Sequence, residues 1–529
     1  MTPRPQSLGV PHPTWREHQY ETIQRVLSTR KPTFFLEAPM GTGKSAVATA
    51  LGSRAPVTVL VATLGLLDQY QREYGFHIVK GRQAYPCPNL SLSTPWLEDL
   101  GIHRTAFDCP FSPMHECPKS GSCPYLIAKH KAKKAHRVAV TYKYAFLSAW
   151  PKERKGILVC DEGHGMAEEI IASSEFAISH WHQRTFGVPN PLKQHFMHGV
   201  RERIQDGHHL WYRVIGYLRD CATRTAHFLR DEDTPNTQRG ARFHNSVKMM
   251  LESSLKITPE WFLDVGPNAV RGRPGLILRP LDARSIATPL WFNKELVVLM
   301  SATIGDPGPL AQELGIESFD THSAPHLIPS EKRPVDIVFT RRMTKRNRDA
   351  HPGLYKAQAL AISGWINSLP PEWRGIVLTT SYHKIDQLRE HLRLGGRLWR
   401  PGKGMGLTER IDAFKESDTP GLVHVDTIQG WGHGLDLRGD MGRFVVVAGV
   451  PFYNPSDPYD RARMSRKGGM KYQRWLAYNA IMQATGRVTR GIRDDDGEYY
   501  LNRAALADGS AITASAMRYY SEWFREAMR

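Results

Sequence analysis

The sequence predicts an α/β protein built on parallel β-sheets. Short apolar runs typical of buried strands alternate with helical segments, both in "FFLEAPMGTGKSAVATAL" (residues 34–51) and across residues 331–529. Such alternation is typical of parallel sheets, whose strands need crossover connections. The chain has 529 residues, of which 41% are hydrophobic. This length is too great for one hydrophobic core, so we expect several compact units.

The chain is strongly basic. Seventy Lys and Arg residues against 52 Asp and Glu give a net charge of +18, and basic runs occur at residues 129–137, 341–348 and 397–403. The excess favours a polyanion such as nucleic acid, although a single run can also be a solvated surface. The longest apolar run, near "ELVVLMSATI", is about half as long as a bilayer span requires. We therefore expect a cytoplasmic protein without a signal peptide or membrane partner.

The first candidate site is a glycine-containing loop that follows a predicted buried strand at residues 33–36 and precedes a predicted helix. Gly41 and Gly43 allow the backbone N–H groups to turn inward, and the helix N-terminus adds positive potential. Lys44 would reach the β- and γ-phosphates of a nucleotide, and Ser45 would hold Mg²⁺. The predicted phosphate cradle consists of Pro39, Met40, Gly41, Thr42, Gly43, Lys44 and Ser45.

Two acids end a second predicted strand in "GILVCDEGHG" (residues 156–165). Asp161 would complete the coordination of Mg²⁺, and Glu162 would orient and deprotonate the attacking water. Two adjacent acids after an apolar run can also form a simple turn.

A third candidate lies far away, in "YNAIMQATGRVTRGIRDDDG" (residues 478–497). On a continuous helix Gln483, Arg487 and Arg490 would fall at i, i+4 and i+7 and share one face. Such a face can supply an arginine finger to the γ-phosphate across a cleft. The alternative is a basic helix face that packs on a neighbouring carboxylate. With Lys44 and the two acids, these residues are the predicted catalytic set.

Four of the six cysteines, Cys87, Cys109, Cys117 and Cys123, lie near one another in the sequence. Disulfides are uncommon in the cytoplasm. The long, unequal gaps do not fit paired C-x₂-C zinc knuckles, and they suit a cubane cluster in which each thiolate binds a different iron. Spacing alone leaves a zinc site and free buried thiols as alternatives.

These motifs resemble those of superfamily 2 helicases, and more narrowly those of the XPD/DinG-like DNA helicase family, over nearly the whole chain. "WREHQYETIQ" resembles the adenine-reading Q motif, "EAPMGTGKS" the family's EAPTGTGKT, and "DEGH" its DEAH box. The other similar segments, in order, are "VLVATLGLLDQY" (motif Ia), "VVLMSATIGDP" (III), "GIVLTTSYHKIDQL" (IV), "QGWGHGLDLRG" (V) and "QATGRVTR" (VI). By this resemblance Arg16, Gln19 and Asp436 also contact the nucleotide. Gly163 replaces the Ala of DEAH, and His433 stands where the family often has an acid.

The resemblance implies a fold of two RecA-like parallel-sheet helicase domains, the first interrupted by an iron–sulfur cluster domain and a helical arch domain. It implies that Cys87, Cys109, Cys117 and Cys123 bind a [4Fe–4S] cluster. The expected limits are residues 1–82, 136–168 and 276–330 for the first helicase domain, 83–135 for the iron–sulfur domain, 169–275 for the arch and 331–529 for the second helicase domain. Within the last, residues 511–529 are expected to form an amphipathic helix that packs on the domain or docks a partner.

The implied function is a monomeric, ATP- and Mg²⁺-dependent 5′–3′ helicase. It would act on single-stranded DNA and on forked or overhang duplexes, with the cluster at the point of strand separation. Two alternatives remain: a nucleic-acid-stimulated ATPase that remodels complexes without processive unwinding, and a binding module with a vestigial nucleotide site.

Overall fold

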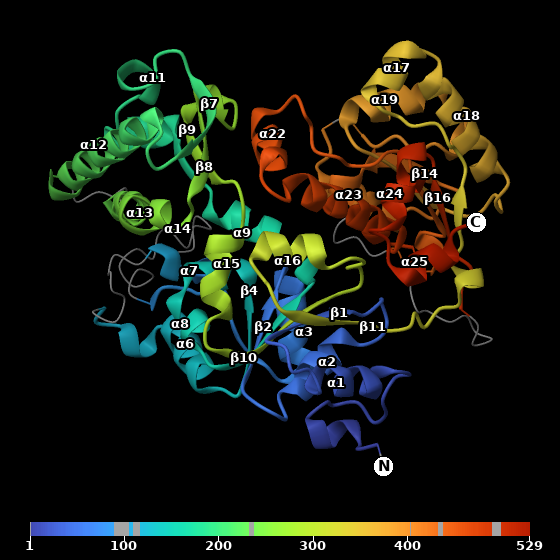
Figure 1. The fold of residues 1–529 in the computed structure, drawn as a ribbon, viewed down its shortest axis with the longest axis horizontal. Coiled ribbons are helices and arrows are strands. Elements are labelled where there is room, and N and C mark those ends of the chain that lie inside the picture. The colour runs from blue at the N-terminus through green and yellow to red at the C-terminus, as the bar shows by residue number, and fades with distance from the viewer. Residues whose placement is uncertain are drawn as a thin grey trace.

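The computed structural model describes residues 2–88, 105–108, 117–231, 237–402, 404–431, 437, 439–488 and 499–529. The expectations that concern Cys109, His433, Asp436 and Arg490 lie outside the described residues. Three bodies, each with its own sheet, are visible in Figure 1: one below that begins at the N-terminus, one at the upper right that contains the C-terminus, and one at the upper left. In the part of the chain described, no helix is long and apolar enough to cross a membrane.

The N-terminal body contains a seven-stranded parallel sheet in the order β11-β1-β10-β5-β2-β4-β3. Its strands are β1 (Thr33–Glu37), β2 (Val57–Val61), β3 (His77–Val79), β4 (Arg137–Thr141), β5 (Gly156–Asp161), β10 (Lys294–Ser301) and β11 (Phe319–Ser323). Strands β1, β2 and β5 are buried along their whole length, as expected for strands covered on both faces. This explains why they are continuous apolar runs rather than alternating ones.

Helices cover this sheet on both faces. They are α1 (Gln19–Leu27), α2 (Lys44–Leu51), α3 (Leu64–Tyr74), α6 (Pro124–Lys134), α7 (Tyr142–Leu147), α8 (Ala149–Glu153), α9 (Met166–Ser174), α15 (Arg284–Trp291) and α16 (Gly308–Leu314). The helix predicted over residues 44–51 is confirmed as α2. The strand predicted before the glycine-containing loop is confirmed as β1, and the strand predicted before the two acids is confirmed as β5.

The C-terminal body contains a five-stranded parallel sheet in the order β12-β16-β15-β13-β14. Its strands are β12 (Val335–Ile337), β13 (Gly375–Thr379), β14 (Val423–Thr427), β15 (Phe444–Val447) and β16 (Arg503–Leu506). Its helices are α17 (Lys345–Ala350), α18 (Leu354–Asn367), α19 (Tyr382–His391), α20 (Leu407–Glu416), α21 (Ile428–Trp431), α22 (Pro458–Ser465), α23 (Gly469–Thr485), α24 (Ala514–Met517) and α25 (Glu522–Ala527). The strands that we expect from the sequence at "DIVFT", "GIVLTT", "LVHVDT" and "RFVVVAG" are confirmed as β12, β13, β14 and β15. Strand β16, with the sequence "RAAL", was missed because it lacks β-branched residues.

The third body contains a four-stranded antiparallel sheet in the order β6-β9-β8-β7, which the sequence analysis did not predict. Its elements are β6 (Phe176–Ser179), α10 (His180–Phe186), α11 (Pro191–Gln194), β7 (Val200–Gln205), α12 (His209–Asp231), α13 (Thr237–Met249), α14 (Leu255–Ile257), β8 (Glu260–Val270) and β9 (Arg273–Pro280). The expectation of a purely helical segment was therefore incomplete. Strand β7, "VRERIQ", is charged and largely exposed, and only its pairing with the buried β8 makes it a strand.

The expectation of a single amphipathic helix over residues 511–529 was wrong. Two short helices, α24 and α25, occupy this segment, and between them Ser521 has an extended backbone. The break allows Tyr520 to be buried, with its hydroxyl donating to the Ala511 carbonyl at 2.9 Å. Long-range burial of an aromatic side chain has thus overridden the local helical pattern.

Candidate functional site: a nucleotide site between the two parallel sheets

The candidate phosphate loop joins the end of β1 to the start of α2. Gly41 and Gly43 have φ values of 89° and 80°, in the left-handed region that favours glycine. A Cβ atom at Gly43 would lie 2.2 Å from Gln19 Nε2, so only glycine fits there without a shift of its neighbour. The loop therefore has the strand, turn and helix geometry that phosphate binding requires.

Gln19 and Arg16 hold this loop from the side of α1. The buried Gln19 amide donates to the Thr42 carbonyl at 3.1 Å and to the Gly43 carbonyl at 3.2 Å. The Arg16 guanidinium donates to the Gly41 carbonyl. Both side chains thus contact the cradle directly, next to the place where a nucleotide would lie.

The end of β5 brings the two acids to the same loop. Lys44 Nζ lies 3.8 Å from Glu162 Oε1 and donates to the Ala38 carbonyl at 3.3 Å. Glu162 has a φ of 53°, a left-handed conformation that costs energy for a residue other than glycine. Backbone strain of this kind is found at sites where a side chain must be aimed precisely, and here the carboxylate is aimed at the loop lysine.

The two acids occupy different electrostatic environments. Burial and the adjacent Glu162 charge raise the pKa of Asp161 above its usual range, although its carboxylate accepts from the Tyr70 hydroxyl at 2.9 Å. Burial also opposes ionisation of Glu162, but the charge of Lys44 and contact with His164 hold its pKa well below its usual range. Glu162 is therefore an ionised acceptor aimed at the loop.

A hydrogen-bonded chain connects Glu162 to the end of β10. His164 Nδ1 lies 3.3 Å from Glu162 Oε2 and 2.8 Å from Ser301 Oγ. The Ser301 hydroxyl is also 3.4 Å from Glu162 Oε2. The "DEGH" segment and the "SAT" segment (residues 301–303) are therefore in direct contact, although they are far apart in the sequence.

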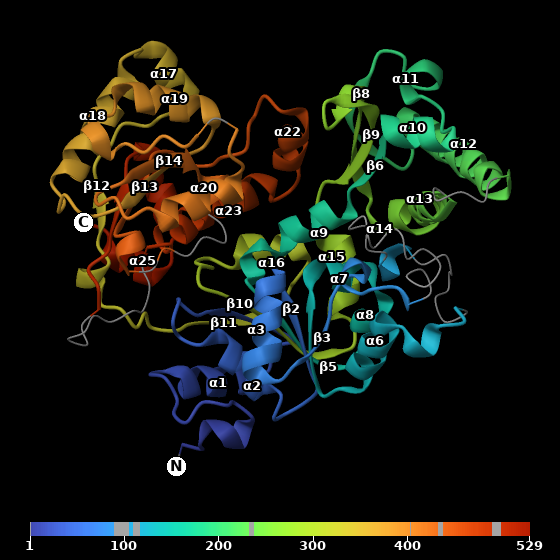
Figure 2. The same cartoon turned by 180° about the vertical axis from the view of Figure 1, so that it is seen from behind.

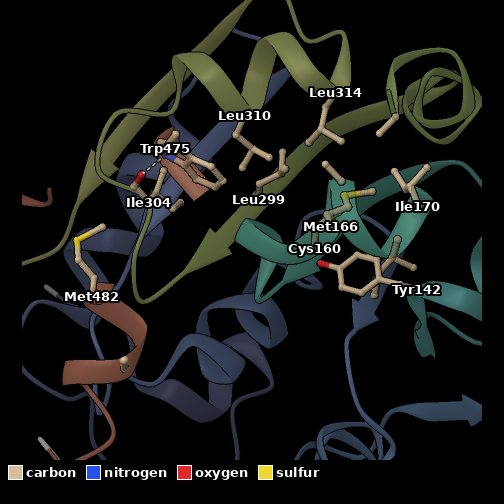
Figure 3. Close-up of a cluster of buried hydrophobic side chains, with 14 of the residues drawn as sticks. Tyr142, Cys160, Met166, Ile170, Leu299, Ile304, Leu310, Leu314, Trp475 and Met482 are labelled. Atoms are coloured by element: carbon tan, nitrogen blue, oxygen red, sulfur yellow. Dashed lines mark hydrogen bonds between the residues drawn. The ribbon is translucent and has the colours of Figure 1, made fainter. Parts of the chain in front are cut away.

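Helix α23 brings the third candidate segment from the C-terminal body to this point. The Gln483 amide donates to Thr303 Oγ1, and the Asn479 amide donates to the Thr303 carbonyl at 2.8 Å. The Trp475 indole donates to the Ile304 carbonyl at 2.8 Å, a bond drawn in Figure 3 within an apolar cluster that includes Leu299 and Leu310. Residues of the N-terminal body and of the C-terminal body therefore meet at the segment after β10.

The predicted continuous helical face was wrong in one respect. Helix α23 ends at Thr485 and Gly486 follows as its cap, since glycine is a poor helix former. Arg487 therefore lies beyond the helix, where its charge still helps to lower the pKa of Glu162. The C-terminal body thus reaches the Lys44–Glu162 pair in two ways: Gln483 bonds to Thr303 of the "SAT" segment, and the charge of Arg487 acts on Glu162.

Three polar residues at this site were not identified from the sequence. Glu37, at the end of β1, is buried and accepts from the Gly305 N–H and the Trp523 indole, each at 2.7 Å. Tyr70 supports Asp161, and Asn479 supports Thr303. A buried acid that ends an apolar strand was a usable signal for Glu37. Tyr70 and Asn479 carried none, because each acts through a distant partner.

The cysteine segment is described only in part. Cys87, Cys117 and Cys123 are buried, and Cys123 directly precedes α6, whereas Cys109 lies outside the described residues. Within the described ranges, no three His, Cys, Asp or Glu side chains are grouped so that they could hold a metal ion. Cys160 is fully buried in β5, where it packs as a small hydrophobic side chain.

Comparisons with known proteins show what the fold and the C-terminal part of the chain are similar to. A family model described as "Helicase C-terminal domain" matches residues 370–526, which include β13 to β16 and α23. A solved XPD helicase has a TM-score of 0.61 and 16% identity, with 96% of this chain and 98% of that chain covered. At 16% identity this likeness confirms the fold that the resemblance to XPD/DinG-like helicases implied.

The chain is also similar to one further solved structure and to two curated proteins. The structure of S. tokodaii Xpd4 has a TM-score of 0.57 and 16% identity and covers 97% of this chain and 99% of that chain; at this identity the likeness concerns the fold. Regulator of telomere elongation helicase 1 homologs from Drosophila melanogaster and Drosophila sechellia are each 25% identical over 260 residues. Those alignments cover 43% of this chain but only 25% and 26% of the relatives, about a quarter of their length.

Proposed function

We propose that this protein is an ATP-dependent helicase that translocates on single-stranded DNA and unwinds duplexes. One observation carries the proposal: the phosphate-loop lysine and Glu162 of one parallel-sheet body lie beside Gln483 and Arg487 of the other. A nucleotide bound between two such bodies is contacted by both, so its hydrolysis can change their separation.

In this mechanism the chain's own residues divide the work. The loop N–H groups and Lys44 would bind the β- and γ-phosphates, and Ser45 and Asp161 would hold Mg²⁺, which neutralises charge on the phosphate oxygens. The ionised Glu162 would orient the attacking water and accept its proton. Arg487 would stabilise the charge that develops on the γ-phosphate.

The choice of substrate rests on charge and on the family. A net charge of +18 favours a polyanion. The relatives named above are helicases, and the resemblance further supports DNA as the substrate and 5′–3′ movement. Single-stranded binding would combine basic side chains with aromatic rings on which bases stack.

Unwinding of forked and overhang duplexes tests this function directly. We expect ATP-dependent strand release with a 5′ overhang, little release with a 3′ overhang, and none with Lys44→Ala, which loses its phosphate contact. A matched RNA duplex in the same assay should release little product. DNA-stimulated ATP hydrolysis without strand release would instead support a remodelling ATPase, and equal ATPase rates for wild type and Lys44→Ala would indicate a binding module.

We also propose that Cys87, Cys109, Cys117 and Cys123 bind a [4Fe–4S] cluster near the point of strand separation. The donor chemistry fits, because residues 87–123 supply four thiols and three of them are buried away from solvent. The described residues include three of the four proposed ligands, Cys87, Cys117 and Cys123. These three thiols are not grouped as metal ligands in the structure, so cluster binding would require them to move closer to one another. The cluster would supply thiolate-bound iron as a structural element.

Iron and sulfide analysis after anaerobic purification tests this metal site without an activity assay. We expect about four irons per chain, as a cubane cluster requires, and a brown protein. Cys117→Ser should lose most of the iron and the colour, whereas Cys221→Ser, a substitution in α12, should keep both. A colourless protein with one equivalent of zinc would contradict the proposal.

A further inference from the structure

A network of five charged side chains connects the two parallel-sheet bodies away from the phosphate loop. Arg463 forms two parallel bonds to Glu168, both of 2.8 Å, and lies 3.3 Å from Glu313 Oε1. Arg466 Nη2 lies 3.1 Å from each Glu313 oxygen, and its Nη1 lies 3.2 Å from Asp282. We call these five residues the α22 ion network, since both arginines belong to α22 or its C-terminal cap.

The partners in this network follow the candidate catalytic segments. Glu168 lies on α9, the helix directly after "DEGH", and Glu313 lies on α16, which follows the "SAT" segment. In both Figure 1 and Figure 2, α22 lies between the C-terminal body and the body that contains the antiparallel sheet. Arg201 of β7 also pairs with Asp457, the cap of α22, at 3.0 Å. Helix α22 of the C-terminal body therefore contacts both of the other bodies.

Helix α22 packs directly against the start of α23. A Cβ atom at Gly469, the first residue of α23, would lie 2.0 Å from the Arg463 carbonyl oxygen, so the two backbones are in contact. The Tyr472 hydroxyl, one turn into α23, donates to Glu168 at 3.0 Å. The same helix carries Gln483 near its other end, roughly 20 Å away at 1.5 Å per residue. A shift of α22 is therefore transmitted along α23 to the candidate nucleotide site.

The burial of the network makes it a specific positioning contact. Arg463 and Glu313 are 3% and 4% exposed. A buried charge that loses its partner is costly, whereas the pair adds little net stability over an apolar contact of the same shape. Such a network therefore favours one arrangement of the two bodies over slightly shifted arrangements. An apolar surface would discriminate less strongly between these arrangements.

We propose that Arg463 is a positioning residue for ATP hydrolysis. By holding α22 against Glu168 and Glu313, it sets α23 so that Gln483 and Arg487 face the nucleotide. This inference rests on the proposed ATPase function. The inference adds a contact outside the nucleotide motifs, on the helices that follow these motifs. Through this contact, a displacement at the interface of the three bodies changes the position of the groups that face the γ-phosphate.

Steady-state ATPase kinetics of Arg463→Gln test the inference, with Arg461→Gln as the matched control because Arg461 is exposed on the same helix. We expect kcat to fall by about tenfold or more, as small displacements of catalytic groups do, while KM for ATP changes by less than about twofold. Arg463→Lys keeps the charge but loses the paired bonds, so its kcat should lie between those of wild type and Arg463→Gln. Thermal unfolding curves establish the folded fraction of each variant.

A double-substitution cycle separates positioning from general stabilisation. If Arg463 acts through Arg487, Arg463→Gln should cause little further loss of kcat in an Arg487→Ala background. Multiplicative losses, or a lower melting temperature with unchanged kcat, would overturn the inference. Its failure is distinct from failure of the proposed function, because the latter would appear as equal ATPase rates in wild type and Lys44→Ala.

Discussion

Glu162→Gln is expected to lower kcat for ATP hydrolysis by about 10²–10⁴-fold, the range of a general base. The substitution keeps the size of the side chain and removes its ability to accept a proton. Contact with Lys44 and His164 holds the native carboxylate in the ionised state, with its pKa below the usual range. The measurement is phosphate release under saturating ATP and single-stranded DNA.

ATP binding should survive this substitution, because the loop N–H groups and Lys44 remain in place. Fluorescent nucleotide titration is expected to give a Kd within about threefold of wild type, and Glu169→Gln, an exposed acid in the following helix, serves as the control. A Glu162→Gln enzyme with wild-type kcat would assign the base to another residue. It would also leave the left-handed backbone at Glu162 without a catalytic reason.

Arg487→Ala is expected to cost about 10³-fold or more in kcat, as loss of an arginine finger does in other phosphoryl-transfer enzymes. Arg487 lies just beyond α23 and close enough to Glu162 for its charge to lower that pKa. Arg487→Lys should remain impaired, since an ammonium group lacks the planar, two-pronged donor geometry of guanidinium. The assay is single-turnover hydrolysis, which isolates the chemical step from product release.

Arg474→Ala is the control for this prediction, because Arg474 is exposed on α23, the helix that precedes Arg487. Unchanged hydrolysis in Arg487→Ala would favour the alternative that the sequence left open, in which the basic segment only packs on a carboxylate. In that case Glu162 would be the packed carboxylate.

Much of the candidate site was predictable because its parts are local. The turn at Gly41 and Gly43, the start of α2 at Lys44 and the position of Asp161 at the end of a buried strand depend on neighbours within a few residues. The parallel sheets followed from the alternation of apolar runs and helices, whereas the strand order within each sheet came only from the structure. The end of α23 was mispredicted because a pattern of i, i+4 and i+7 does not register the weakness of glycine as a helix former.

The α/β class, the glycine-containing loop before α2 and the two acids at the end of β5 were predictable from the sequence, since each depends on short-range backbone preferences and on the order of segments. Only the tertiary structure decided the antiparallel sheet β6-β9-β8-β7, the broken C-terminal helix and the α22 ion network. Arg463 and Glu168 are separated by 295 positions in the chain. No local pattern records such a pair, because its energy exists only when burial brings the two charges together.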